Sequence, residues 1–138
     1  MTIIKGDIVP GIRIGEFTIG TLKEEIMVKI KGDYKQWERG DGFSTITLEN
    51  AEMWFDTTQR LQQIAVTKGF QDKYNTIGIG STMKDVVEKF GAYENDGVEY
   101  LIKGIEGICF ELGDMDEWGD DYWDELYAPI EWIFVYRI

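Results

Sequence analysis

The chain has 138 residues, 43% hydrophobic and 14% aromatic, which is enough for one domain with a packed core. Its formal net charge is −12 and its pI is near 4.3, which argues against nucleic-acid binding, because phosphate contacts need clustered Lys and Arg. The sequence has no His and one Cys. A Ser–His or Cys–His nucleophile and an intramolecular disulfide are therefore excluded within this chain.

The start of the chain, MTIIKGDIVPG, does not have the pattern of a signal peptide. No apolar run in the sequence is long enough to span a membrane. We therefore expect a cytoplasmic protein that does not bind a membrane. No glycine-rich phosphate-binding loop is present in a nucleotide-binding context, so we expect no cofactor and no enzymatic activity.

Two similar segments begin at Ile19, with IGTLKEEIMVKI, and at Ile79, with IGSTMKDVVEKF. Each has a threonine followed three residues later by an acid, which predicts a helix N-cap, and the first pair has the form of a capping box. Apolar residues at helical spacing follow, and Gly32 and Gly91 are expected to end the helices. The capping pairs are Thr21 with Glu24 and Thr82 with Asp85, and the apolar faces are Leu22, Ile26 and Ile30, then Met83, Val86, Val87 and Phe90.

Three strand-like runs follow each predicted helix, and short polar links between them suit antiparallel hairpins. The sequence therefore predicts the α+β class, with a helix and a three-stranded antiparallel meander occurring twice. We expect residues 1–138 to form one domain of two repeats, about 11–70 and 76–138, joined near KGFQDKYN. The predicted strands are residues 43–48, 52–55 and 61–67, then 98–103, 107–112 and 130–137.

This plan resembles the tandem-repeat fold of the β-lactamase inhibitor proteins and their relatives. The resemblance rests on Gly20-Thr21 and Gly80-Ser81-Thr82 at the helix starts, and on WFDTTQRLQQIAV with the matching APIEWIFV. It implies that the two repeats merge into one curved sheet with the helices on one face. A weaker resemblance connects the chain to small immunity proteins that accompany bacterial toxins.

Strand alternation predicts which side chains share a face of this sheet. If Ile64 and Val66 point toward the helices, Ile133 and Val135 do so as well, because LQQIAV and IEWIFV align. The opposite face then carries Gln63, Ala65 and Thr67 in the first repeat and aromatic residues in the second. Large aromatic side chains on an open sheet face are common anchors of protein interfaces. The aromatic residues predicted for this face are Trp132, Phe134 and Tyr136, with Trp54 beside them.

Two interpretations of these rings stay open. The rings could form an exposed partner site. They could instead be covered by the segment from Gly113 to Pro129, which has aromatic residues of its own, or by a second copy in a homodimer. Trp37 and Arg39, in a predicted turn at residues 36–42, are interpreted as ordinary loop side chains.

The acidity is concentrated near the C-terminus, in GDMDEWGDDYWDELYAPIEW. Residues 1–103 contain 13 Lys or Arg and 16 Asp or Glu, whereas residues 104–138 contain one basic and ten acidic residues. Asp114, Asp116, Gly119 and Glu125 match positions of a calcium-loop template. Trp118 replaces the usual ligand at the fifth position, so a metal site with Asp114, Asp116 and Glu125 is kept only as an alternative.

Acidic and aromatic side chains together could imitate the charge and stacking surface of a nucleic acid, and so occupy the binding cleft of a basic protein. The alternatives are a solvated loop without specificity, the calcium module and a self-associating structural protein. We predict a non-catalytic, immunity-type inhibitor that neutralises a basic partner protein such as a toxin or nuclease. The predicted partner contacts are Trp54, Asp114, Asp116, Glu117, Asp120, Asp121, Asp124, Trp132, Phe134 and Tyr136.

Overall fold

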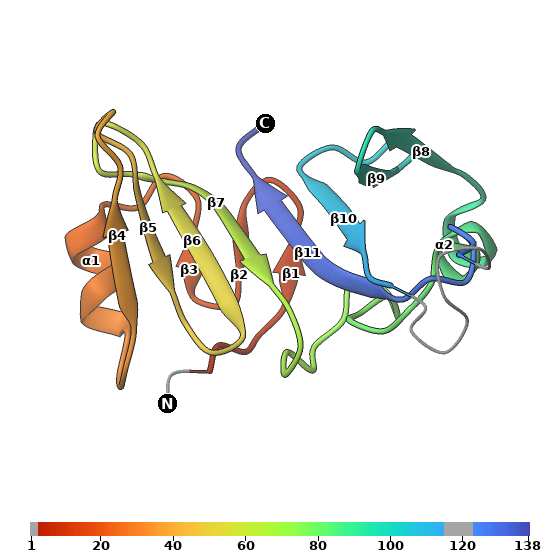
Figure 1. Cartoon of the computed structure of the whole chain (residues 1–138), viewed down its shortest axis with the longest axis horizontal. Helices are drawn as coiled ribbons and strands as arrows, with labels where there is room; N and C mark the ends of the chain where they lie inside the picture. Colours follow the sequence, from red (N-terminus) through yellow and green to blue (C-terminus); the bar gives the residue numbers. More distant parts are fainter. Residues whose placement is uncertain (1–2, 115–122) are drawn as a thin grey trace.

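A computed structural model describes residues 3–114 and 123–138 of the chain. Its main feature is an eight-stranded antiparallel sheet with the order β4-β5-β6-β7-β11-β10-β9-β8 (Figure 1). β7 and β11, which lie far apart in the sequence, pair at its centre. The strands are β4 Lys35–Glu38, β5 Ser44–Thr47, β6 Ala51–Phe55, β7 Leu61–Val66, β8 Tyr93–Asp96, β9 Glu99–Ile102, β10 Ile108–Leu112 and β11 Ile130–Tyr136.

Three short strands and two helices complete the described structure. The strands β1 (Ile8–Val9), β2 (Arg13–Ile14) and β3 (Phe17–Thr18) form a second antiparallel sheet. In Figure 1 this small sheet lies behind the large one, near its centre. The helices α1 (Lys23–Lys29) and α2 (Met83–Phe90) lie toward the two ends of the large sheet (Figure 1). The α+β class predicted from the sequence is therefore confirmed.

One apolar cluster joins the small sheet, both helices and one face of the large sheet. Strand alternation produces this cluster, since every second side chain of a central strand points to the same side. In β6, for example, Ala51, Met53 and Phe55 are fully buried, while Glu52 and Trp54 between them are partly exposed. The opposite face of the large sheet therefore carries a separate set of side chains.

Of the two predicted threonine N-caps, the one at α2 is confirmed and the one at α1 is wrong. Thr82 caps α2 in a complete capping box, accepting a hydrogen bond from the Asp85 backbone N–H while the Asp85 carboxylate accepts from the Thr82 N–H. The capping box predicted at Thr21 is wrong: the N-cap of α1 is Leu22, and no side chain caps it. Thr21 and Leu22 are instead engaged by strand-like pairing, since the Thr21 carbonyl accepts from Leu61 N–H and Leu22 forms a bridge with Arg60.

Five strands were not predicted: the three of the small sheet, β4 and β8. The predicted turn at residues 36–42 is wrong in its first half, because Trp37 lies in β4 and pairs with Thr45 of β5. Each half of the large sheet therefore has four strands instead of the predicted three. Both additional strands lie at the sheet edges, where side chains are mostly exposed and the alternation of apolar residues is absent.

Candidate functional site

The register of β7 and β11 confirms the predicted assignment of side chains to the two faces. Val66 pairs with Ile133, Ile64 pairs with Val135, and all four side chains are fully buried in the core. The neighbouring pair, Ala65 and Phe134, therefore points to the opposite face of the sheet. Gln63 and Tyr136 pair on that same face.

We define the aromatic face as Trp54, Trp132, Phe134 and Tyr136, the four aromatic residues that the sequence predicted for this surface. The ring centroid of Phe134 lies 6.1 Å from that of Trp54 and 6.2 Å from that of Trp132, and both pairs are tilted. These distances lie within the range of favourable aromatic pairs. All four side chains are partly buried, so each keeps some surface exposed to solvent. In Figure 1 the small sheet β1–β3 lies on the far side, away from this face.

Small side chains lie on the same face as the rings. Ala65 is 0% exposed and Cys109, which pairs with Phe134, is 3% exposed. Burial is the largest cause that raises the pKa of the Cys109 thiol, to about 12, and the nearby Glu99 and Glu111 carboxylates raise it further. Cys109 therefore stays protonated at neutral pH and is a poor nucleophile. The sequence-based interpretation of Cys109 as a buried, hydrophobic thiol agrees with its burial.

Acidic residues border the rings on the β9–β10 side. Glu111 pairs with Trp132 across β10 and β11. Burial raises the pKa of the Glu111 carboxyl, and the carboxylates of Glu99 and Glu131 raise it further. Neighbouring negative charges disfavour the ionised form of a partly buried carboxyl group, and an approaching cation would stabilise that form. Glu99 and Glu111 were not among the predicted contacts, although strand alternation in GICFEL places Glu111 on the same face as Cys109.

Trp37 extends the row of aromatic side chains toward the edge of the sheet. It pairs with Thr45, which in turn pairs with Trp54, so the three side chains share one face. Trp37 is 67% exposed, much more than the residues of the aromatic face. This exposure agrees with the position of Trp37 on β4, the edge strand of the large sheet.

The structure tests the predicted acidic contacts only in part. Asp114 and Asp124 are exposed, while Asp116, Glu117, Asp120 and Asp121 lie outside the described residues. The segment ends are tied together, because the Trp123 indole N–H donates to the Gly113 carbonyl at 3.0 Å and the Gly113 N–H donates to the Pro129 carbonyl at 2.7 Å. The described part of the acidic segment therefore joins β11 close to Glu131 and Trp132.

The calcium alternative finds no support in the part of the chain that the structure describes. Within residues 3–114 and 123–138, no group of three or more Asp, Glu, Cys or His side chains could hold a metal ion. Glu125, the last ligand of the template, accepts a hydrogen bond from the Tyr93 hydroxyl at 2.9 Å. Asp116, the third position of the template, lies outside the described residues.

Within residues 3–114 and 123–138, no helix is sufficiently long and apolar to traverse a bilayer.

Comparisons with known proteins provide one structural relative. The chain matches no protein-family model, and its sequence matches no curated protein. It is similar in structure to the uncharacterized protein yfeY from Escherichia coli, with a TM-score of 0.61 and 20% sequence identity. The likeness covers 95% of this chain and 100% of that one. At this identity the likeness shows that the two proteins share a fold, and it assigns no function.

Proposed function

We propose that this protein is a non-catalytic protein-binding module, a cytoplasmic immunity-type inhibitor that neutralises a basic partner protein at its aromatic face. The observation that carries the proposal is the contact of Trp54, Phe134 and Trp132 on a sheet face away from the core. Partly exposed aromatic side chains bury a large area when a partner binds and lose little conformational entropy. They are the anchors of the proposed interface.

The charge near this face favours a basic partner. Burial raises the pKa of the Glu111 carboxyl, and the nearby carboxylates of Glu99 and Glu131 raise it further. A lysine or arginine side chain brought in by a partner would relieve that repulsion and could also stack on an indole ring. The net charge of −12 adds a long-range attraction, which speeds the encounter with a basic protein at low ionic strength. In this proposal Asp114 and Asp124, at the ends of the acidic segment, contribute to the same field.

The proposal includes the tandem-repeat architecture, with repeats at about 11–70 and 76–138. Two matching pairs of backbone hydrogen bonds support it. Gly20 N–H donates to the Leu61 carbonyl and Leu61 N–H to the Thr21 carbonyl; likewise, Gly80 N–H donates to the Ile130 carbonyl and Ile130 N–H to the Ser81 carbonyl. Each pair fastens the segment before a helix to the start of the last strand of the same half. Helices on one face of the sheet would leave the aromatic face available to a partner.

The test is capture of interacting proteins from the lysate of the native cells at low salt, followed by measured binding of the purified partner. We expect a basic protein that binds the wild type with high affinity and is released by raised salt. The variants of the aromatic face, Trp132→Ala and Phe134→Ala, should each weaken binding by at least roughly tenfold. This corresponds to a loss of about 1.4 kcal/mol of binding free energy. Val28→Ala is the control, because it removes an exposed apolar side chain from α1, outside the aromatic face.

Three outcomes would contradict the proposal. Equal binding of the wild type and the face variants would place the partner elsewhere on the molecule. Recovery of this protein alone, with a dimer in sedimentation that the face variants break, would make it a self-associating protein. Binding that requires calcium and is abolished by a chelator would favour the metal module at Asp114–Glu125. Circular dichroism and thermal unfolding of each variant separate lost binding from lost folding.

A further inference from the structure

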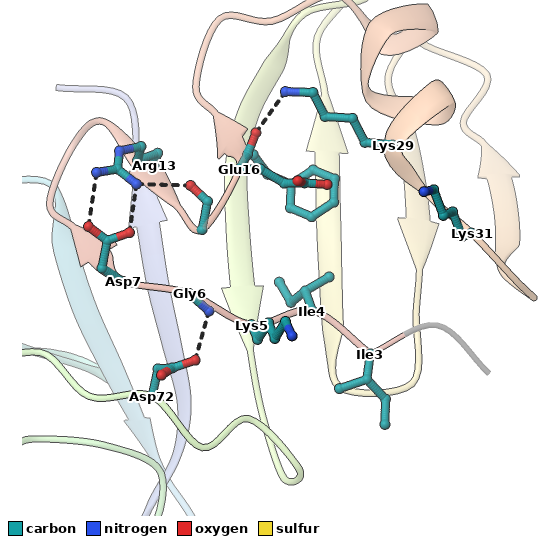
Figure 2. A pocket seen from close by; sticks show the side chains of 12 residues that line it. Ile3, Ile4, Lys5, Gly6, Asp7, Arg13, Glu16, Lys29, Lys31 and Asp72 are labelled. Carbon is teal, nitrogen blue, oxygen red and sulfur yellow. Dashed lines mark hydrogen bonds and ion pairs between the residues drawn. The ribbon is translucent and has the colours of Figure 1, made fainter.

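A pocket of about 790 Å³ lies among the N-terminal segment, the turn between β2 and β3, and the end of α1. Figure 2 shows Ile4 and Lys5 on one side, Glu16 above them, and Lys29 and Lys31 extending from the α1 side. The volume falls within the range of small-molecule sites in proteins. The pocket involves elements on the core side of the large sheet, so it is separate from the aromatic face.

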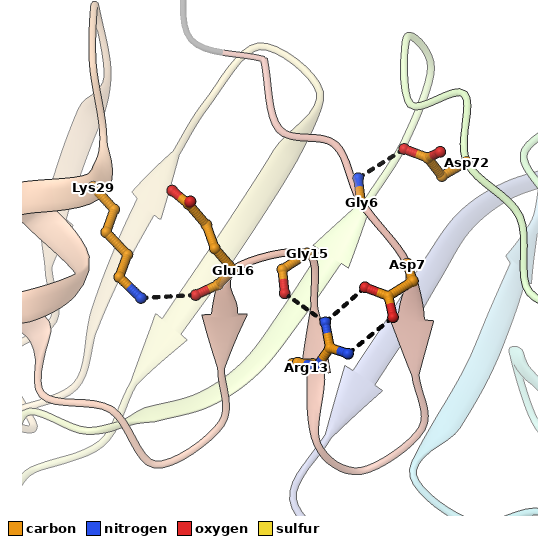
Figure 3. Close-up of polar contacts among 7 residues, drawn as sticks. All are labelled: Gly6, Asp7, Arg13, Gly15, Glu16, Lys29 and Asp72. Carbon is orange, nitrogen blue, oxygen red and sulfur yellow. Dashed lines mark hydrogen bonds and ion pairs between the residues drawn. The ribbon is translucent and has the colours of Figure 1, made fainter.

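Two glycines build one wall of this pocket. Gly6 and Gly15 both have positive φ, at 122° and 59°, and a Cβ on Gly6 would lie 2.5 Å from the Gly15 Cα. Only residues without a side chain permit such a close crossing of two backbones. The Gly6 N–H donates to the Asp72 carboxylate at 2.7 Å, which holds the N-terminal segment in place (Figure 3). The wall is therefore fixed before any ligand arrives.

The pocket is rich in cations although the chain as a whole is strongly acidic. Four cationic and three acidic residues line it, in a protein with a net charge of −12. Interactions between exposed charges more than about 8 Å apart are largely screened at physiological ionic strength. The charged residues that line the pocket therefore decide which ligands it attracts. The cationic residues are Lys5, Arg13, Lys29 and Lys31, and the acidic ones are Asp7, Glu16 and Asp72.

Two of the three carboxylates already have donors within the protein. Asp7 accepts two hydrogen bonds from the Arg13 guanidinium, at 2.6 and 2.9 Å, and Asp72 accepts from the Gly6 backbone (Figure 3). Lys29 Nζ, by contrast, donates to the Glu16 backbone carbonyl at 3.0 Å, and this bond uses one of its three protons. Its positive charge meets a neutral carbonyl there and stays available to an anion.

We propose that this pocket binds a small phosphate-bearing molecule, with Lys29 as the cation that holds the phosphate. Lysine ammonium groups act as compact point charges and suit a dianionic phosphate, whereas the guanidinium that could grip a carboxylate in two-point fashion is committed to Asp7. Ile3, which is 58% exposed, lines the same pocket and provides an apolar contact for the body of the ligand. The Glu16 carboxylate repels the phosphate and lowers the affinity of the pocket for it.

The test is a titration of the full, isotope-labelled chain with phenyl phosphate, inorganic phosphate and benzyl alcohol, followed by amide NMR shifts. We expect saturable shifts at Gly6, Gly15 and Lys29 with phenyl phosphate, weaker binding of inorganic phosphate, and none of benzyl alcohol. The variant Lys29→Ala should weaken phenyl phosphate binding by roughly tenfold, the effect of losing 1.4 kcal/mol. Lys103→Ala, which removes an exposed lysine outside the pocket, is the matched control and should leave the affinity unchanged.

Glu16→Gln is a second variant whose expected effect has the opposite sign. Removal of this carboxylate should tighten phenyl phosphate binding several-fold, because a repulsive charge disappears while the side chain keeps its size. Failure to fold cannot produce such a gain. The proposal is overturned if the three probes shift the same amides equally, if no pocket amide shifts at millimolar phenyl phosphate, or if Lys103→Ala weakens binding as much as Lys29→Ala.

Discussion

The ring of Trp54 on β6 lies 6.1 Å from the ring of Phe134 on β11, although 80 positions separate them in the chain. Ala65 makes this contact possible. It stands on β7 between the two strands, pairs with Phe134 on one side and with Glu52 on the other, and is too small to separate the rings. The aromatic pair therefore joins the two halves of the large sheet across its centre.

We expect this ring pair to contribute a measurable coupling to stability. In a double-mutant cycle of Trp54→Ala and Phe134→Ala, the free energies of urea unfolding should show a coupling of about 0.5–1.5 kcal/mol. The control cycle pairs Trp37→Ala with Phe134→Ala, and its coupling should lie within about 0.5 kcal/mol of zero because Trp37 stands at the sheet edge. A coupling between Trp54 and Phe134 no larger than that of the control cycle would contradict the expected contribution of this ring pair to stability.

The helix caps provide a second matched pair. Thr82→Ala should destabilise the protein by about 1 kcal/mol, because it removes the acceptor for the Asp85 N–H at the start of α2. Thr21→Ala should change stability by no more than about 0.5 kcal/mol, because its side chain caps nothing and its backbone bonds to Leu61 survive the substitution. Thermal or urea unfolding measures both variants. A larger loss at Thr21 than at Thr82 would contradict the structure.

The central strands were predictable because alternation and burial agree there. The runs at 61–67 and 130–137 became β7 and β11 within one residue at the C-terminal ends, and the assignment of Ile64, Val66, Ile133 and Val135 to the core was correct. The strands β1–β3 have two residues each, which is too short for a period of two to appear in the sequence. Tertiary pairing, not local pattern, defines them.

The aromatic face could be predicted from the sequence, whereas the pocket could not. Trp132, Phe134 and Tyr136 followed from alternation in one strand, and Trp54 followed from its position between two core residues. The pocket around Lys5 and Lys29 could not be predicted, because its residues come from four separate segments that only the fold brings together. No local spacing connects Asp72 to Gly6, whose hydrogen bond spans 66 positions.

The Glu111 carboxyl should make stability depend on pH. Its pKa in the folded protein is raised, first by burial and then by Glu99 and Glu131, so the folded state holds a proton that the unfolded state has already released. Stability therefore falls as pH rises through the carboxyl range, and is unaffected by this group below its unfolded pKa. Glu111→Gln should stabilise the protein at neutral pH, and the gain should vanish in acid.

Urea unfolding of Glu111→Gln and wild type across the carboxyl titration range measures this difference. The control is Glu88→Gln, the same substitution at an exposed position on α2. A gain of the same size at every pH would mean that the substitution acts through packing and not through the charge of Glu111.

Asn50, 1% exposed, fastens the N-terminal segment to the large sheet through two hydrogen bonds. Its side-chain carbonyl accepts from the Ile4 N–H and its amide donates to the Ile4 carbonyl, both at 2.9 Å. Asn50→Ala would leave two buried backbone groups without partners, so we expect a loss of about 2–4 kcal/mol in the free energy of unfolding. Asn95→Ala removes an exposed asparagine that donates to the Gly97 carbonyl, and should cost no more than about 0.5 kcal/mol.

Hydrogen exchange locates the effect of Asn50→Ala. The Ile4 amide should exchange much faster in this variant than in the wild type, while Ile64 in the centre of β7 should keep its protection until global unfolding. Because Ile4 also lines the phosphate pocket, phenyl phosphate should bind this variant more weakly. Unchanged protection at Ile4 would mean that the Gly6–Asp72 bond and the burial of Ile4 hold the N-terminal segment without help from Asn50.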